Sequence, residues 1–331
     1  MSNKEYLLHP LIVGNIEIKG NLFLAPLAGY TDKSFRTLCI ENGADLTISE
    51  MVSSEGIARG NQKTVKLMER ADIEKNFSIQ IFSGNLDSVQ RGFDALLAFN
   101  PTIIDINCGC PVPKVTKTGA GSALMKDPKT MGSIVNFLTT HTDIPVSIKF
   151  RTGWDLENEN YIDFAKTAID NGVNLIAMHA RTKTQGYAPT AHWDRLENLV
   201  NIIHREYKDI PVIGSGDIFS ALDAFNMLNT TGVDGIMAAR GAIGNPCIFN
   251  QVKQYVKTGS YNEISIEDRI TLMKHQLELM SADIGEDIAL REMRKHCCAY
   301  IKGFPGSSKV KMELMGATTK EDYNLALSHL I

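Results

Sequence analysis

Short apolar runs alternate with longer amphipathic stretches along most of the chain. The runs are rich in β-branched residues and continuously apolar, which is typical of parallel strands covered on both faces. Eight such runs are expected to be strands: Phe23–Pro26, Asp45–Ser49, Ser78–Phe82, Ile103–Asn107, Pro145–Phe150, Asn174–His179, Pro211–Ser215 and Asp234–Ala238. The pattern therefore predicts a parallel sheet made of strand–helix units.

The stretches between these runs predict helices, and several carry start and stop signals. Asp127-Pro128 offers a cap followed by proline in the first turn, and Gly43 and Gly172 stand where helices should end. The expected helices are Asp32–Asn42, Leu86–Phe99, Asp127–Thr140, Tyr161–Asn171, Trp193–Arg205 and Ser220–Asn229. Eight units in about 250 residues match the size of a (β/α)₈ TIM barrel, an α/β fold. On pattern alone, a doubly wound open sheet stays an alternative.

After Gln251 the pattern is helical only, with helices expected at Ile266–Asp283, Ile288–Lys302 and Lys320–Leu330 and a break at Gly303–Ser308. The sequence thus predicts two domains: a barrel over residues 1–254 and a small α-helical domain over 255–331.

Composition constrains the partners and the cellular compartment. The chain has 331 residues, with 34 Lys+Arg against 38 Asp+Glu and a formal charge of -4, so any nucleic acid must be held by a local basic patch. No apolar stretch approaches the roughly 18 residues of a membrane span, and the first residues lack a signal-peptide pattern. Six cysteines without a disulfide framework fit a reducing cytoplasm. We expect a cytoplasmic protein with no membrane partner.

The predicted strands end in polar and glycine-rich segments, where a barrel of this kind builds its active site. Ser215-Gly216-Asp217 and Ala239-Arg240-Gly241 follow the seventh and eighth strands and each opens a helix, which predicts a phosphate site. The segment Gly119–Ser122 is a weaker candidate, because it lacks the Lys-Ser/Thr ending of a nucleoside-triphosphate loop.

Cationic residues and one thiol complete the predicted mouth of the barrel. Lys149, Arg151, His179 and Arg181 lie at strand ends and favour an anionic cofactor and a phosphate-bearing substrate. Cys110, in a Gly-Cys-Pro loop, is either a structural thiol or an acid or nucleophile, and its loop position favours chemistry. The spacing of Cys108 and Cys110 is not that of a metal site, and Cys297-Cys298 would point apart on a helix, so no metal is expected.

At this point the chain resembles the tRNA-dihydrouridine synthase family, closest to its bacterial B-like branch. The resemblance runs from about Asn21 to Gly306. It rests on Ala25–Asp32 with Phe35-Arg36, Ser49–Met51, Gln80–Gly84, Asp105–Pro111 with Lys114-Val115, Lys149 with Arg151–Trp154, His179–Thr182, Ile213–Asp217, Gly232–Gly235, Gly244–Pro246, and Arg291–His296 with Tyr300 and Gly303.

The resemblance implies an oxidoreductase acting on a CH–CH bond, which uses FMN and NADPH (or NADH) to reduce a uridine of tRNA to 5,6-dihydrouridine. Hydride would pass from reduced FMN to uracil carbon 6, and Cys110 would give a proton to carbon 5. The implied cofactor-binding residues are Pro26, Leu27, Ala28, Gln80, Lys149 and His179 for the flavin and Ser215, Gly216, Asp217, Ala239 and Arg240 for its phosphate. Asn107 and Arg181 are implied to grip the flipped-out uracil.

The helical appendage supplies a basic patch for RNA. From Arg291 to Lys311 there are six Lys or Arg and one acid, and Arg291, Arg294 and Lys295 share one helix face. Lys114, in the loop beyond Cys110, is a further candidate contact. We expect a monomer that binds tRNA.

The sequence departs from the family pattern at three positions: Cys108 replaces a common methionine, Ala239 a glycine and Ala299 a tryptophan. Two alternatives remain at this stage, a flavin-dependent dehydrogenase of a free pyrimidine and an RNA-binding protein whose barrel no longer catalyses.

Overall fold

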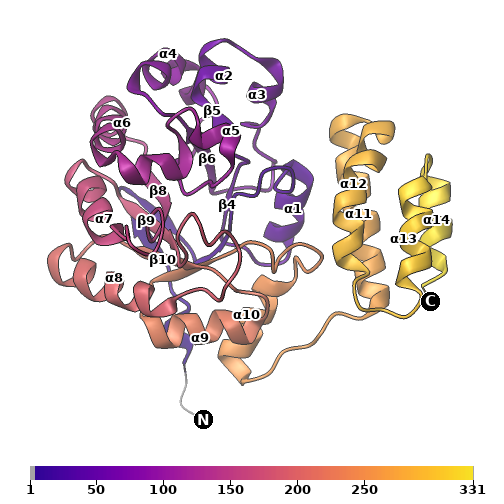
Figure 1. Cartoon of the computed structure of the whole chain (residues 1–331). Helices are drawn as coiled ribbons and strands as arrows, with labels where there is room; N and C mark the ends of the chain where they lie inside the picture. Colours follow the sequence, from indigo (N-terminus) through magenta and orange to yellow (C-terminus); the bar gives the residue numbers. More distant parts are fainter. Residues whose placement is uncertain (1–3, 331) are drawn as a thin grey trace.

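The core of the molecule is a closed barrel of parallel strands. The computed structural model describes residues 4–330, and Figure 1 shows the helices arranged around the barrel. In order around the barrel, the strands are β3 (Leu22–Leu24), β4 (Leu46–Ile48), β6 (Phe77–Phe82), β7 (Ile103–Cys108), β8 (Val146–Arg151), β9 (Leu175–His179), β10 (Val212–Ser215) and β11 (Gly235–Ala238). All eight predicted strands are confirmed. The pairing of β4 with β6 and of β11 with β3 closes the sheet, so the open-sheet alternative is wrong.

A short antiparallel hairpin covers the N-terminal end of the barrel. It consists of β1 (Leu11–Val13) and β2 (Ile16–Ile18). Val13 and Ile18 are fully buried in the same apolar cluster as the inward-facing residues Phe23 and Ile103. This end of the barrel is therefore filled by apolar side chains. The hairpin was not predicted, because three-residue strands are too short to give a periodic signal.

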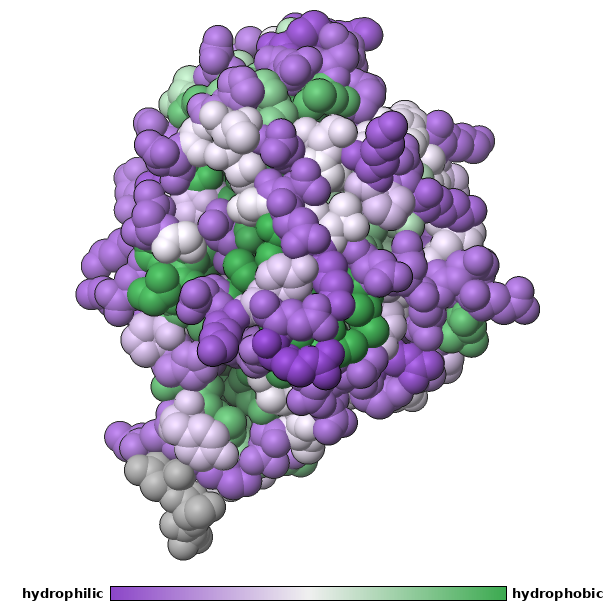
Figure 2. Space-filling model, turned by 90° about the vertical axis from the view of Figure 1, so that its left-hand side faces the viewer, coloured by the Kyte–Doolittle hydropathy of each residue, from purple (hydrophilic) through white to green (hydrophobic). Residues whose placement is uncertain are grey.

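The barrel helices begin and end largely where the sequence predicts. They are α1 (Lys33–Glu41), α4 (Leu86–Leu97), α6 (Pro128–His141), α7 (Tyr161–Asp170), α8 (Trp193–Glu206) and α9 (Ala221–Thr231). Asp127 caps α6 by accepting a hydrogen bond of 3.0 Å from the Thr130 N–H, as its position before Pro128 suggested. The side of the molecule that faces left in Figure 1 is largely hydrophilic (Figure 2), as expected for helices that turn their apolar faces to the barrel.

Several short elements lie between these units and were not predicted. They are η1 (Glu5–Leu7), β5 (Val52–Ser53), α2 (Ser54–Ala58), α3 (Gln62–Lys66), α5 (Pro113–Thr116) and η2 (Gly121–Lys126).

The C-terminal region is a separate cluster of four helices beside the barrel (Figure 1). They are α11 (Ile266–Ile284), α12 (Glu286–Tyr300), α13 (Ser307–Gly316) and α14 (Lys320–Ser328). Met273, Met293 and Tyr323 belong to an apolar cluster that these helices share with Leu38 of α1. Helix α13 was not predicted. None of the helices within residues 4–330 is long and apolar enough to cross a membrane.

Helix α10 (Ile248–Thr258) lies across the expected boundary between residues 254 and 255. Its buried residues Ile248, Phe249, Val252 and Val256 belong to the apolar cluster of the barrel. An extended segment then leads to α11 (Figure 1). The packing groups α10 with the barrel, since its apolar face is buried there.

A buried ion pair fixes the first barrel helix to the chain that precedes β6. Arg36 Nε lies 2.7 Å from Glu74 Oε1, and the two side chains are 2% and 0% exposed. The Glu74 carboxylate also accepts a hydrogen bond from the Ala71 N–H, and the Arg36 guanidinium donates to the Thr31 carbonyl. Thr31 ends the loop that follows β3, so this pair orders one wall of the barrel mouth.

Replacing Arg36 by methionine should destabilise the protein strongly, because Glu74 would be left as an unpaired buried charge. We expect a loss of about 3–5 kcal/mol in the free energy of unfolding, measured by urea denaturation. The matched control is Arg59→Met, which removes a solvent-exposed partner of Glu55 and should change the unfolding midpoint little. Equal shifts of the unfolding midpoint in the two variants would show that the buried pair stabilises the protein no more than the exposed pair does.

Candidate functional site

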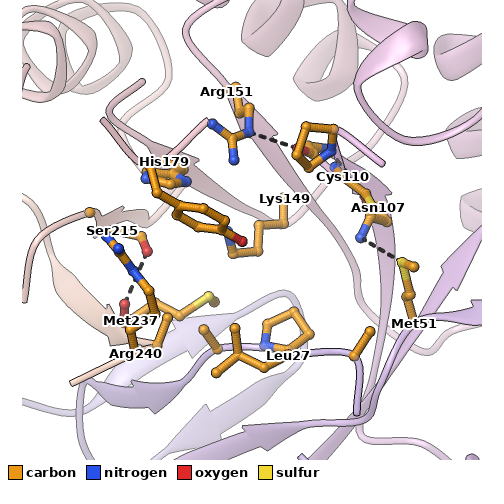
Figure 3. A pocket seen from close by; sticks show the side chains of 18 of the residues that line it. Leu27, Met51, Asn107, Cys110, Lys149, Arg151, His179, Ser215, Met237 and Arg240 are labelled. Carbon is orange, nitrogen blue, oxygen red and sulfur yellow. Dashed lines mark hydrogen bonds between the residues drawn. The ribbon is translucent and has the colours of Figure 1, made fainter. Parts of the chain in front are cut away.

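A cavity of about 570 Å³ opens at the C-terminal ends of the barrel strands. Its size lies within the range of about 300–1,000 Å³ usual for small-molecule sites. All eleven residues predicted to hold a cofactor line it, together with Cys110 and Asn107. Cys110 and Asn107 lie on one side, Ser215 and Arg240 on the other, and Lys149 between them (Figure 3). The strand-end residues singled out from the sequence therefore converge in space.

A chain of hydrogen bonds runs across three strands from the barrel interior to the Cys110 loop. The buried carboxylate of Asp105 on β7 accepts bonds from Ser147 Oγ on β8 (2.6 Å) and from Gln80 Nε2 on β6 (2.7 Å). Gln80 Oε1 in turn accepts a bond of 2.7 Å from Asn107 Nδ2. The Asn107 side-chain oxygen accepts a bond of 2.9 Å from the Cys110 N–H. We call these residues, Ser147, Asp105, Gln80 and Asn107, the interior relay.

The Cys110 loop is held from its other side as well. The Cys110 carbonyl accepts hydrogen bonds from the Ser122 N–H at 3.0 Å and from its hydroxyl at 2.9 Å. A Cβ on Gly121 would lie 2.8 Å from that carbonyl, so glycine is required for this approach. Burial raises the pKa of the Cys110 thiol above its usual value of 9.0, while the nearby Val112 N–H, Arg151 and Lys149 oppose the shift. The thiol is therefore protonated at neutral pH and can act as a proton donor.

Cys108, the second thiol of this segment, lies on the opposite face of β7. It is fully buried and packs in the apolar cluster between barrel and helices. Because alternate residues of a strand point to opposite faces, Asp105 and Asn107 point inward while Cys108 points outward. Only Cys110 of the two lines the cavity.

Burial shifts the pKa values of the ionisable side chains inside the site. Burial raises the pKa of Asp105 to about 6, against the hydrogen bonds from Ser147 and Gln80. Burial and then the neighbouring Arg151 lower the pKa of Lys149 to about 8. Burial lowers the pKa of His179 well below 6.5, and Arg151 and Lys149 act in the same direction, so its imidazole is neutral. The cavity therefore keeps a positive charge, and an anionic group bound there would reduce the repulsion among its cations.

The predicted phosphate loops meet at the other end of the cavity. Gly216 and Asp217 both have positive φ, +120° and +56°, which turns the chain sharply after β10. A Cβ on Gly241 would lie 2.1 Å from the Ile218 carbonyl, so the loops after β10 and β11 touch through glycine. Arg240 contacts Asp217 at 3.2 Å, and its guanidinium lies 4.6 Å from the Tyr187 ring.

Arg181 does not line the cavity. It is 1% exposed, and its Nη2 donates to both carboxylate oxygens of Asp217 at 2.7 and 2.6 Å. Its remaining groups bond the Pro189 carbonyl and contact the His179 ring nitrogen. The expected contact between Arg181 and the uracil has no support in this geometry, because its guanidinium holds the loop after β10.

Two cavity residues were missing from the predicted substrate-binding set. Arg151 was recognised only as part of the cationic mouth, and it lines the cavity while donating to the Gly109 carbonyl at 2.8 Å. Tyr187 is 54% exposed and projects from the loop after β9. It gave no sequence signal because it lies well beyond the strand end.

The basic face of α12 adjoins the mouth of the cavity. The Lys295 ammonium lies 6.0 Å from the ring of Tyr30, a cavity-lining residue, and also pairs with Glu292. Arg291 is exposed and Arg294 is half-buried. Lys114, on α5, is exposed and lies outside the cavity lining. Within residues 4–330, no group of three or more His, Cys, Asp or Glu side chains is arranged to hold a metal ion.

Comparisons with known proteins identify the family of the chain. The family described as "Dihydrouridine synthase (Dus)" matches residues 23–330. A "Probable tRNA-dihydrouridine synthase" of Treponema pallidum (strain Nichols) is 38% identical over 96% of this chain and 95% of its own length. A "tRNA-dihydrouridine synthase B" of Pseudomonas putida (strain KT2440) is 35% identical over 90% of this chain and 88% of its own.

A solved structure, that of a 2-naphthoyl-CoA reductase with 2-naphthoyl-CoA, matches with a TM-score of 0.60 at 9% sequence identity. The match covers 76% of this chain and 52% of the reductase, and it concerns the fold alone. The family match and the relatives decide the identity. The chain belongs to the dihydrouridine synthase family of enzymes, and the function predicted from the sequence is confirmed at that level.

Proposed function

We propose that this protein reduces a uridine of tRNA to 5,6-dihydrouridine in the cytoplasm, with FMN as cofactor and NADPH as reductant. The observation that carries the proposal is the convergence of Cys110, Lys149 and the two phosphate loops in one cavity. A proton donor, a buried cation and an anion-binding turn are the groups that such a reduction requires of the protein. In this proposal the protein acts as a monomer.

The cavity fits FMN by the chemistry of its lining. Within residues 4–330, Lys149 has no hydrogen-bond or ion-pair partner of its own, so its ammonium is available to a group in the cavity. The loops at Ser215–Asp217 and Ala239–Arg240 offer backbone groups and a guanidinium to a phosphate. Pro26, Leu27 and Ala28 line one wall with apolar and backbone surface. When bound, FMN supplies the hydride.

The chain's own residues position the base and deliver the proton. Cys110 holds a proton at its thiol and transfers it to carbon 5 of the uracil. The Asn107 and Arg151 side chains and the Tyr187 ring line the same cavity and bind the uracil. Arg151 takes the role that the resemblance implied for Arg181, because Arg151 lines the cavity and Arg181 does not.

The helical region holds the RNA outside the cavity. Arg291, Arg294 and Lys295 on α12 contact backbone phosphates, and Lys114 adds a contact near the Cys110 loop. The proposed division of labour places the cofactor in the barrel, which includes α10, and the binding of tRNA on helices α11 to α14. A base in folded RNA must leave its stack to reach the barrel mouth.

The decisive experiment is anaerobic reduction of the purified holoenzyme by NADPH, followed by addition of tRNA that lacks modifications. We expect the absorption of oxidised flavin to return with tRNA and not with free uracil or dihydroorotate-pathway substrates. Return only with the small pyrimidine would assign the chain to free-base reduction instead.

In the same assay, Cys110→Ala should leave reduction of the flavin by NADPH unchanged, because the thiol takes no part in that step. Its reoxidation by tRNA should slow by at least about 100-fold, the usual effect of losing a general acid. Cys108→Ala is the matched control, since this thiol faces away from the cavity. Wild-type rates in Cys110→Ala would remove Cys110 from its proposed role.

The affinity for FMN should fall as pH rises above about 8. Lys149 has a pKa near 8 and binds an anionic or electron-rich ligand in its protonated form, so deprotonation weakens binding. Titration of the apoprotein with FMN, followed by quenching of flavin fluorescence, measures this dependence. Lys149→Met should bind FMN more weakly and without that pH dependence. An affinity for the wild type that stays constant from pH 7 to 9 would contradict the assignment.

Asp105 should act as a positioning residue through the interior relay. Asp105→Leu removes the acceptor for Gln80 and Ser147 and should slow uridine reduction by about tenfold to 100-fold, as small misplacements of reacting groups do. Asp105→Asn can still accept from Gln80 and donate to Ser147, so it should retain most of the rate. Equal losses in both variants would indicate that the charge, rather than the relay, matters.

A further inference from the structure

A tryptophan beside the barrel mouth is flanked by two ammonium groups. The Lys126 Nζ lies 3.6 Å and the Lys183 Nζ 4.3 Å from the centre of the Trp154 ring. Lys126 ends η2, Trp154 follows β8, and Lys183 lies in the loop after β9. Since both distances are measured to one ring, the two charges lie within about 8 Å of each other, close enough to repel. We call these three residues the tryptophan clamp.

The clamp lacks any anionic partner in the part of the chain that the structure describes. Neither lysine forms an ion pair or a side-chain hydrogen bond with residues 4–330, and the Trp154 indole N–H likewise donates to none of them. The neighbouring carboxylate of Asp155 is turned into its own loop, where it accepts bonds from the backbone of Glu157 and from Asn158. Two lysines share one aromatic ring without neutralisation, which favours an external anion.

The backbone fixes Trp154 and Lys183, two of the three clamp residues, relative to each other before any ligand binds. The Trp154 carbonyl accepts a hydrogen bond of 3.0 Å from the Thr184 N–H, and the Gly153 carbonyl accepts one of 2.9 Å from the Lys183 N–H. A Cβ on Gly153 would lie 2.2 Å from the Asn158 carbonyl, so this turn is tightly packed. The loops after β8 and β9 are thus joined, and little ordering is needed when an anion binds.

The position of the clamp around the barrel is opposite to that of α12. In the order β3, β4, β6, β7, β8, β9, β10, β11, strand β8 stands four places from β3 in either direction. Helix α12 reaches the mouth beside Tyr30, which follows β3, whereas Trp154 follows β8. The cavity therefore lies between two cationic regions at the same end of the barrel.

We propose that the tryptophan clamp is a second RNA contact, which binds a backbone phosphate on the far side of the target nucleotide from α12. The inference rests on the proposed function, in which an RNA strand crosses the mouth while one base enters the cavity. The two ammonium groups, which lie within about 8 Å of each other, and the indole N–H supply donors to the phosphate. The contact carries no sequence information and fixes the register of the strand.

The test compares Lys126→Gln/Lys183→Gln with a control that removes two exposed lysines elsewhere, Lys208→Gln/Lys257→Gln. Lys208 precedes β10 and Lys257 ends α10, so both lie toward the closed, N-terminal end of the barrel. Binding of unmodified tRNA to each holoenzyme is measured as Kd over a series of salt concentrations. The control keeps the same net charge as the test variant, so a nonspecific charge effect would appear equally in both.

We expect the clamp variant to raise Kd at low salt by at least about fivefold and to reduce the slope of log K against log salt by about one to two, while the control matches the wild type. Reduction of the flavin by NADPH should be unchanged in both. Trp154→Phe keeps the aromatic ring and loses the N–H donor, and it should show a smaller rise in Kd than the lysine variant.

Two results would overturn the inference. One is a clamp variant with the Kd and salt slope of the wild type. The other is an equal loss in the clamp variant and in the control. If the wild-type protein bound no tRNA at all, the proposed function itself would be contradicted. Failure of the clamp inference and failure of the proposed function are therefore distinguishable.

Discussion

The interior relay is the interaction on which the site depends. A carboxylate inside a barrel is costly to bury unless its oxygens are hydrogen-bonded. Asp105 meets this condition through Ser147 on one neighbouring strand and Gln80 on the other. The same bonds orient the Gln80 amide, which orients Asn107 and through it the backbone of Cys110. The register of three parallel strands thus determines where the thiol stands.

Charge balance inside the mouth explains why so many cations can share one cavity. Lys149, Arg151 and Arg240 line the cavity, and Arg181 is buried beside it. Asp105 lies near Lys149, and Asp217 pairs with Arg181 and Arg240. Asp217 neutralises Arg181 and Arg240 and fixes the loop after β10. Burial lowers the pKa of Arg151 to about 10, with Arg181 acting in the same direction. The whole chain is net negative, so the cations of the mouth form a local concentration of positive charge.

The helical region joins the barrel through aromatic and charged contacts next to the cavity. His296 of α12 is fully buried, its ring centre is 5.3 Å from those of Tyr30 and Phe35, and its Nε2 lies 3.6 Å from an Asp32 carboxylate oxygen. Tyr30 lines the cavity and Asp32 caps α1. Because one loop serves both the cavity and this interface, the position of the basic face of α12 is tied to that of the barrel mouth.

The sequence by itself determined the eight strands, the barrel helices, the family and most of the site. Those features follow from local hydrophobic patterns and from motifs that lie on consecutive strand ends, which a parallel barrel must bring together. The tertiary structure alone decided the contacts of particular side chains. Arg181 pairs with Asp217, which lies 36 residues further along the chain, and Tyr187 reaches the cavity from a loop without periodicity. The closing hairpin and the docking of α12 likewise depend on contacts between residues far apart in the chain, and no local pattern encodes those contacts.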